Sequence, residues 1–207
     1  MYIYLFTILI CYLIGSIPTA YIMGKYLKGI DIRNHGSGNV GATNALRVLG
    51  KKAGSITLLI DILKGAICVS LIPMLFAEKS NELIRIIACI SVIAGHIWTV
   101  FLKFKGGKGI ATSCGAFLGL TPIPVLITVA IFGVTLACFR YVSLGSITAA
   151  FCLPFLIFFM EHSITYTIFS SIIAALLIFK HRANIKRLLN ETENKIGKST
   201  AKKPVVY

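Results

Sequence analysis

Residues 35–47 form the first segment whose side chains and spacing could do chemistry, because glycines alternate there with hydrogen-bond donors. Glycine lets the backbone curl until successive N–H groups converge on one oxyanion. Arg47 can hold a phosphate through two parallel hydrogen bonds, and residues 42–49 are predicted to form a short helix with free N–H groups near the glycines. These features predict an anion site. Its candidate residues are Ser37, Gly38, Asn39, Asn44 and Arg47.

The glycines of this segment also spell G-x-G-x-x-G, the pattern of a dinucleotide-binding loop, and Asp61 follows at about the expected distance. That motif works between a strand and a helix of a soluble βαβ unit. Here hydrophobic stretches that could cross a membrane lie on both sides, and Asp61 falls inside the second. The context therefore excludes a dinucleotide site and favours anion capture.

A second glycine-rich segment, at residues 104–112, carries two lysines at a turn that opens a predicted helix. A Walker A loop needs Ser or Thr directly after its Gly-Lys pair, whereas Gly109 follows Lys108. The segment is not a P-loop, but Lys105 and Lys108 predict a second anion site. His96, a short distance upstream, is expected to support this site by packing or hydrogen bonding rather than to act as a catalyst.

A third basic segment, at residues 180–187, begins where the last hydrophobic stretch ends. On a continuing helix His181 and Asn184 share a face, because they lie three positions apart. His181 could act as a base or hydrogen-bond a hydroxyl group. A belt of basic side chains at the membrane surface would account for Lys186 and Arg187, but it gives no reason for His181 and Asn184.

Two smaller features leave alternatives open. Ser143 and Ser146 could offer hydroxyl groups from a fourth turn on the same side. Asp61 and Lys64 lie one helical turn apart inside a predicted span, where charges are costly and usually face the bundle interior. For this pair a structural role is at least as well supported as a catalytic one.

The elements that position these residues are predicted to be membrane-spanning helices, so the fold class is all-α and polytopic. Of the 207 residues, 57% are hydrophobic, and a soluble domain would need a far more polar surface. A helix needs about 20 apolar residues to cross a bilayer. No polar block is large enough for a second domain, which predicts one transmembrane domain over residues 1–207. The predicted spans are residues 2–24, 54–76, 83–103, 109–122, 124–139, 143–160 and 163–180.

The charge distribution predicts about seven spans, with the N-terminus outside and the C-terminus in the cytoplasm. Lys and Arg gather in alternate loops, as they do in cytoplasmic loops, and the three segments above fall among them. If residues 109–122 and 124–139 formed one kinked or re-entrant unit, six crossings would result and some basic loops would face the wrong side. A basic tail follows from about residue 186, and its part from Asn190 onward is expected at the anionic leaflet or disordered.

Composition also bounds the partners. The net charge of +14 suits anionic lipid and small anionic substrates in addition to topology, and we expect no nucleic-acid partner. The six cysteines stand alone in apolar stretches and the few acids are separated from the histidines, so neither a metal nor a cofactor is expected. The N-terminal stretch lacks a basic start and a small-residue cleavage site, which predicts a retained span.

The motifs that carry a resemblance lie at residues 15–21, 36–44, 95–96, 104–109 and 180–184. In combination they resemble the bacterial acyl-phosphate:glycerol-3-phosphate acyltransferases, a family of integral membrane enzymes, over essentially the whole chain. The resemblance implies a multi-pass protein of the bacterial inner membrane with seven helices and a cytoplasmic active site. It also implies transfer of a fatty acyl group from acyl phosphate to the 1-hydroxyl of glycerol 3-phosphate. The products would be lysophosphatidate, which enters phospholipid synthesis, and inorganic phosphate.

The resemblance implies roles residue by residue. Ser37, His181 and Asn184 are implied at the reaction centre, where His181 orients the substrate or accepts its proton. Because an acyl phosphate is already activated, neither an acyl-enzyme nor coenzyme A is needed. The H-x-x-x-x-D signature of soluble-type glycerolipid acyltransferases does not occur in this sequence. The residues implied in phosphate or glycerol binding are Gly38, Asn39, Asn44, Arg47, Lys105 or Lys108, Ser143 and Ser146.

Two other classes of function compete with this interpretation. A small transporter for an organic phosphate could use the same basic sites, but it would need polar groups on the opposite side and broken helices near the midplane. The predicted outer loops are short and chemically poor, which argues against it. A non-enzymatic membrane subunit could use the basic loops to dock a partner. An assay with purified protein and both substrates separates the three.

Overall fold

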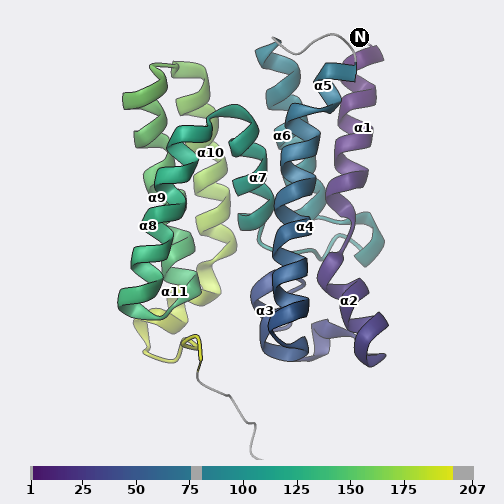
Figure 1. Cartoon of the computed structure of the whole chain (residues 1–207), viewed down its shortest axis with the longest axis vertical. Coiled ribbons are helices and arrows are strands. Elements are labelled where there is room, and N and C mark those ends of the chain that lie inside the picture. Colours follow the sequence, from purple (N-terminus) through teal and green to yellow (C-terminus); the bar gives the residue numbers. More distant parts are fainter. Residues whose placement is uncertain (1, 76–80, 198–207) are drawn as a thin grey trace, which may run out of the picture.

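The computed structural model describes residues 2–75 and 81–197, and every regular element in these ranges is a helix. The long helices run side by side as one bundle, with α3 and α11 near the same end (Figure 1). One group holds α1 (Tyr2–Ser16), α2 (Thr19–Lys28), α3 (Ala42–Leu49), α4 (Lys51–Ser70), α5 (Ile72–Leu75) and α6 (Glu82–Ile97). The other holds α8 (Pro122–Phe139), α9 (Val142–Glu161), α10 (Ile164–Lys180) and α11 (Arg182–Leu189). Between the two groups lies α7 (Ile110–Leu120), which packs on α4.

The first predicted span is broken in the structure. α1 ends at Ser16 and α2 begins at Thr19, because Pro18 lacks an N–H group and cannot continue the helix ladder. Just before the break, α1 approaches α6 so closely that a Cβ atom on Gly15 would lie 2.2 Å from the Val92 carbonyl oxygen. Only glycine fits at this crossing, which fixes the position of the break against α6.

The short helix predicted over residues 42–49 is confirmed as α3 (Ala42–Leu49). It is followed by Gly50, whose φ of 97° is a conformation that glycine adopts readily and other residues rarely do. The chain reverses there into α4. A Cβ atom on Gly54 of α4 would lie 2.7 Å from the Leu46 backbone, so α3 packs directly against the start of α4. This hairpin places the glycine-rich segment 35–41 beside the middle of α4.

The prediction of an all-helical polytopic membrane protein is confirmed at the level of fold class. Five helical segments are long and apolar enough to cross a bilayer, and a sixth is added if α10 and α11, which are bent by 58°, count together. α7 is apolar but shorter. The outer surface is apolar too, as for Phe155, Phe159 and Ile168, which are more than half exposed. Such side chains are at home against lipid rather than water.

Candidate functional site

A polar cavity of about 140 Å³ lies where α3, α4, the loop before α7, α9 and the α10–α11 bend meet. It brings together segments that are far apart in the sequence, including all three basic segments. Gly38 and Lys105 do not line it, and the Lys105 side chain is exposed. The predicted residues that do line it are Ser37, Asn39, Asn44, Arg47, Lys108, Ser143, Ser146, His181 and Asn184.

The glycine loop of the first segment is wrapped around the side chain of Asn44. The Asn44 amide accepts a hydrogen bond from the Ser37 backbone N–H at 2.9 Å and donates to the carbonyl oxygens of His35 and Asn39 at 3.0 and 2.9 Å. Gly36 has a φ of 61°, and a Cβ atom there would lie 2.2 Å from Asn44 Oδ1. Asn44 therefore braces the loop, and its amide is engaged with backbone groups. Ser37 is left exposed at the rim of the cavity.

The second segment is fastened to the end of α6. The backbone N–H groups of Gly106 and Gly107 donate to the carbonyl oxygens of Ile97 and His96 at 3.1 and 3.0 Å. A Cβ atom on Gly107 would lie only 2.2 Å from His96 Nε2, so the loop passes directly over the imidazole. This packing agrees with the supporting role expected for His96. It directs Lys108 toward the cavity, and Lys105 stays outside.

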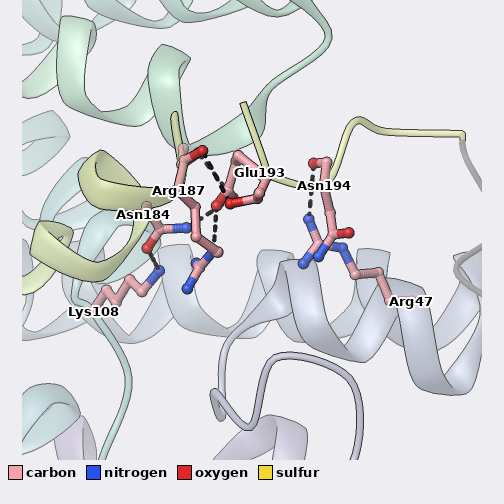
Figure 2. Close-up of polar contacts among 8 residues, drawn as sticks. Arg47, Lys108, Asn184, Arg187, Glu193 and Asn194 are labelled. Carbon is pink, nitrogen blue, oxygen red and sulfur yellow. Dashed lines mark hydrogen bonds and ion pairs between the residues drawn. The ribbon is translucent and has the colours of Figure 1, made fainter. Parts of the chain in front are cut away.

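Lys108 and Asn184 form one wall of the cavity. Lys108 Nζ donates a hydrogen bond to Asn184 Oδ1 (Figure 2). Burial, together with the nearby positive charge of Arg187, lowers the pKa of Lys108 to about 8. An ammonium group that is so poorly solvated gains strongly from an incoming phosphate.

His181 lies at the bend between α10 and α11, not on the continuing helix that the sequence predicted. Its Nδ1 lies 2.8 Å from the Leu177 carbonyl oxygen, which can only accept, so the proton of the neutral ring is on Nδ1 and Nε2 is free to accept. Burial and the charge of Lys108 lower the pKa of His181 to about 4. At neutral pH the ring is therefore uncharged, as a proton acceptor must be.

Glu193 completes the site and was missed by sequence reasoning. Its buried carboxylate accepts hydrogen bonds from Ser143 Oγ at 3.1 Å, Asn184 Nδ2 at 2.9 Å and Arg187 Nε at 2.6 Å (Figure 2). Burial raises the pKa of Glu193, but the bonds from Asn184 and Arg187 outweigh it and leave the pKa below its usual value. The charged carboxylate orients Asn184, whose other end faces Lys108. The only signal in the sequence was that Glu193 is one of two acids, with Glu191, in an otherwise basic tail.

The chain after α11 folds back over the cavity, whereas the sequence predicted a tail on the membrane surface or without order. Arg47 donates to the Asn194 carbonyl oxygen at 3.3 Å (Figure 2). The Ile196 backbone N–H donates to the Arg140 carbonyl oxygen at 2.8 Å. Residues 190–197 thus cover the cavity, and the rest of the predicted tail lies outside the described residues.

An apolar cavity of about 220 Å³ continues from the polar one between α4, α7, α8 and α9. Leu58 and Val129, which line it, are 45% and 46% exposed, so it opens toward the outside of the bundle. Within residues 2–75 and 81–197, no three His, Cys, Asp or Glu side chains gather as metal ligands would. The two cavities share Leu58, Ile110, Ala111, Phe132 and Ser146.

Comparison with known proteins places this arrangement in context. Residues 5–191 match the family model described as glycerol-3-phosphate acyltransferase. A glycerol-3-phosphate acyltransferase of Thermoanaerobacter sp. (strain X514) is 50% identical over 94% of this chain and 96% of its own length. The enzyme of the same name from Clostridioides difficile (strain 630) is 44% identical over 94% of this chain and 96% of its own.

Two solved structures share the fold. Both are of PlsY (YgiH), an integral membrane glycerol 3-phosphate acyltransferase. Its glycerol 3-phosphate form matches with a TM-score of 0.87 and 38% identity, over 94% of this chain and 96% of that one. Its lysophosphatidic acid form matches with a TM-score of 0.85 and 36% identity, over 94% and 95% of the two chains.

Proposed function

This chain belongs to the glycerol-3-phosphate acyltransferase family, and from that premise we propose that it makes lysophosphatidate for phospholipid synthesis. The acyl donor is an acyl phosphate, and the acceptor is the 1-hydroxyl of glycerol 3-phosphate. The C–O bond between acyl group and phosphate breaks, the ester bond forms, and the hydroxyl proton leaves with inorganic phosphate. No cofactor is needed, because the mixed anhydride is already activated.

One observation carries the proposal: the polar cavity and an apolar cavity lie side by side and share lining residues from α4, α7, α8 and α9. The reaction needs a place for two phosphates beside a place for a hydrocarbon chain. The apolar cavity opens through Leu58 and Val129 toward the surrounding lipid, which suits a donor that arrives from the bilayer. A small soluble acceptor would instead enter at the polar end.

We assign different residues of the polar cavity to phosphate binding, to orientation of the attacking hydroxyl and to contact with the substrate. Arg47 and Lys108 hold the phosphates, and the side chains of Ser37 and Asn39 add donors at the loop. Positioning and charge stabilisation of this kind are worth roughly 3–4 kcal/mol for a single oxyanion donor. His181 orients the attacking hydroxyl or accepts its proton at Nε2, beside Asn184. Ser143 and Ser146 contact substrate at the junction, where Ser146 lines both cavities.

We also propose the orientation in the membrane. The chain is one transmembrane domain of seven helices in the bacterial inner membrane, with α7 as a short span. The N-terminus lies outside, and the site and the C-terminus lie on the cytoplasmic side. The last turn of α2 and the first turn of α4 lie at the same end of the bundle as α3 (Figure 1), and these helices end at Lys28 and begin at Lys51, respectively. Positive charge at the cavity end supports a cytoplasmic site.

The test is a two-substrate assay with purified protein in detergent. With acyl phosphate and glycerol 3-phosphate, lysophosphatidate and inorganic phosphate should form in equal amounts, and acyl-CoA should not replace acyl phosphate. A protein that forms no lysolipid from either donor would contradict the proposal and point to a transporter or an adaptor.

A further inference from the structure

An ionic cluster inside the bundle takes no part in the reaction as proposed so far. Asp61 and Lys64 lie one turn apart on α4, with Nζ 2.8 Å from Asp61 Oδ1, and His96 faces them from α6. The three residues are only 1%, 5% and 7% exposed, respectively. Charges this deep in a membrane bundle are costly and usually serve a function.

Lys64 has a structural task that accounts for its burial. Its Nζ donates to the Ile17 carbonyl oxygen at 3.3 Å, at the break between α1 and α2. The last carbonyls of a helix have no partner within it, so a donor from outside stabilises such an end. This bond explains the lysine and its need for a counter-charge. It does not explain why the carboxylate lies at the wall of the polar cavity.

The Asp61 carboxylate has one oxygen unused by the protein. Thr19 Oγ1 at 3.3 Å, Lys64 Nζ and His96 Nδ1 at 3.8 Å all approach Oδ1. Lys64 forms its ion pair with the carboxylate as a whole, and no hydrogen bond to Oδ2 is made by a residue that the structure describes. Asp61 and His96 both line the polar cavity. A carboxylate oxygen at a cavity wall can accept a hydrogen bond from a molecule bound in that cavity.

The position of Asp61 fits one part of the acceptor. Leu58 lies three positions earlier on the same face of α4 and lines both cavities. A group held by Asp61 therefore lies about one helical turn, ~5 Å, from the junction where the acyl carbonyl must sit. The Asp61 carboxylate accepts hydrogen bonds from hydroxyl groups, whereas Arg47 and Lys108 donate to phosphate and carry the opposite charge to it. The cavity thus has one end for phosphate and one for hydroxyl.

Building on the proposed function, we propose that Asp61 determines specificity for the acceptor. Its free oxygen accepts a hydrogen bond from the secondary hydroxyl of glycerol 3-phosphate, and this bond turns the primary hydroxyl toward the acyl carbonyl. Asp61 binds and orients the acceptor through the secondary hydroxyl, and it takes no proton from the primary hydroxyl that attacks the acyl carbonyl. The site therefore selects a phosphate monoester that carries two neighbouring hydroxyl groups.

The experiment compares two acceptors, glycerol 3-phosphate and 3-hydroxypropyl phosphate, which lacks only the secondary hydroxyl. A hydrogen bond to a charged group corresponds to about 10- to 100-fold in kcat/KM, so the wild-type protein should prefer glycerol 3-phosphate by that factor. In the double variant Asp61→Leu/Lys64→Met, which removes both charges together, kcat/KM for glycerol 3-phosphate should fall to the level of 3-hydroxypropyl phosphate. The value for 3-hydroxypropyl phosphate should change little.

Controls separate this role from a structural one. Thr19→Val removes a contact to Oδ1 but leaves the other oxygen in place, so the preference should persist. If the double variant does not fold, Asp61→Asn serves instead and should lower the preference several-fold. Equal losses for both acceptors, or a wild-type protein without preference, would overturn the inference. A wild-type protein inactive on both acceptors would instead contradict the proposed function.

Discussion

Two cavities lined mainly by apolar side chains lie among the residues that the structure describes, and the larger is not the one that we assign to the acyl chain. A cavity of about 560 Å³ lies between α9 and α10 and is lined by side chains such as Phe151, Phe155 and Ala175. The assigned cavity, of about 220 Å³, is smaller. It shares lining residues with the polar cavity, whereas among the described residues the larger one shares no lining residue with the polar cavity. Continuity with charge, not size, distinguishes a reaction site from a lipid-filled groove.

The largest effect should come from removing the positive charge of Arg47, because charged side chains line the polar cavity and none of the described residues that line the larger apolar cavity is charged. Arg47→Ala takes away the guanidinium at the polar end, and kcat/KM should fall by about 100-fold or more, as for loss of a charged donor in other sites. Arg47→Lys should also be poor, because an ammonium group cannot form the paired bonds. Steady-state kinetics on folded protein in membranes measures both.

Lys51→Ala is the matched control, since Lys51 is exposed at the start of α4 and does not line the cavity. Its kcat/KM should stay near that of the wild-type protein. If Lys51→Ala lost as much activity as Arg47→Ala, residues 35–51 would act through their overall positive charge, and the position of Arg47 in the polar cavity would not matter.

The next largest effect should come from filling the cavity assigned to the acyl chain, and it can be compared with the effect of filling the larger apolar cavity. Ala149→Phe fills the joined cavity, and for a long-chain donor kcat/KM should fall about tenfold, roughly 1.4 kcal/mol, because the phenyl ring takes the space of the acyl chain. Ala175→Phe fills the larger cavity and should leave kinetics almost unchanged. A larger loss from Ala175→Phe than from Ala149→Phe would reverse the assignment.

The part of the site that sequence could predict is the part built from local segments. α3 was predicted to the residue, and the three basic segments do converge on one cavity. What depends on tertiary packing could not be predicted. Nothing local distinguishes Lys105 from Lys108, and only the passage of the glycines over His96 separates them. Glu193 lies close to Ser143 only because the chain reverses after α11.

A smaller effect should follow from neutralising Glu193, the carboxylate that the sequence did not predict at the site. Glu193→Gln keeps the shape of the side chain but removes the negative charge that accepts hydrogen bonds from Arg187 and Asn184. Residues 190–197 should therefore be held less firmly at the polar cavity. We expect a lower melting temperature and a several-fold loss of kcat/KM, because Ser143 and Asn184 lose a charged acceptor and Arg187 loses its ion-pair partner. Thermal unfolding and kinetics measure the two. Glu191→Gln, at an exposed position of the same turn, should change neither, and an equal effect there would remove the special role of Glu193.

The smallest effect is a shift in pH dependence. Lys108 binds phosphate in its charged form, and its pKa is lowered to about 8, so the charge is present below that pH and lost above it. On this basis kcat/KM for glycerol 3-phosphate should decline as the pH rises through about 8. Lys108→Arg should move the decline to higher pH, even at reduced activity. A decline at the same pH in the variant would assign it to another group.

The central claim is that one continuous space holds the acyl chain and both phosphates. Photo-crosslinking tests it most directly, with a non-hydrolysable acyl phosphonate that carries a diazirine in mid-chain. The account predicts adducts on residues of the joined cavity, such as Cys114, Val129 and Ala149, that disappear when acyl phosphate competes. Competed adducts on Phe151, Phe155 and Ala175 of the larger cavity, with the joined cavity unlabelled, would contradict it.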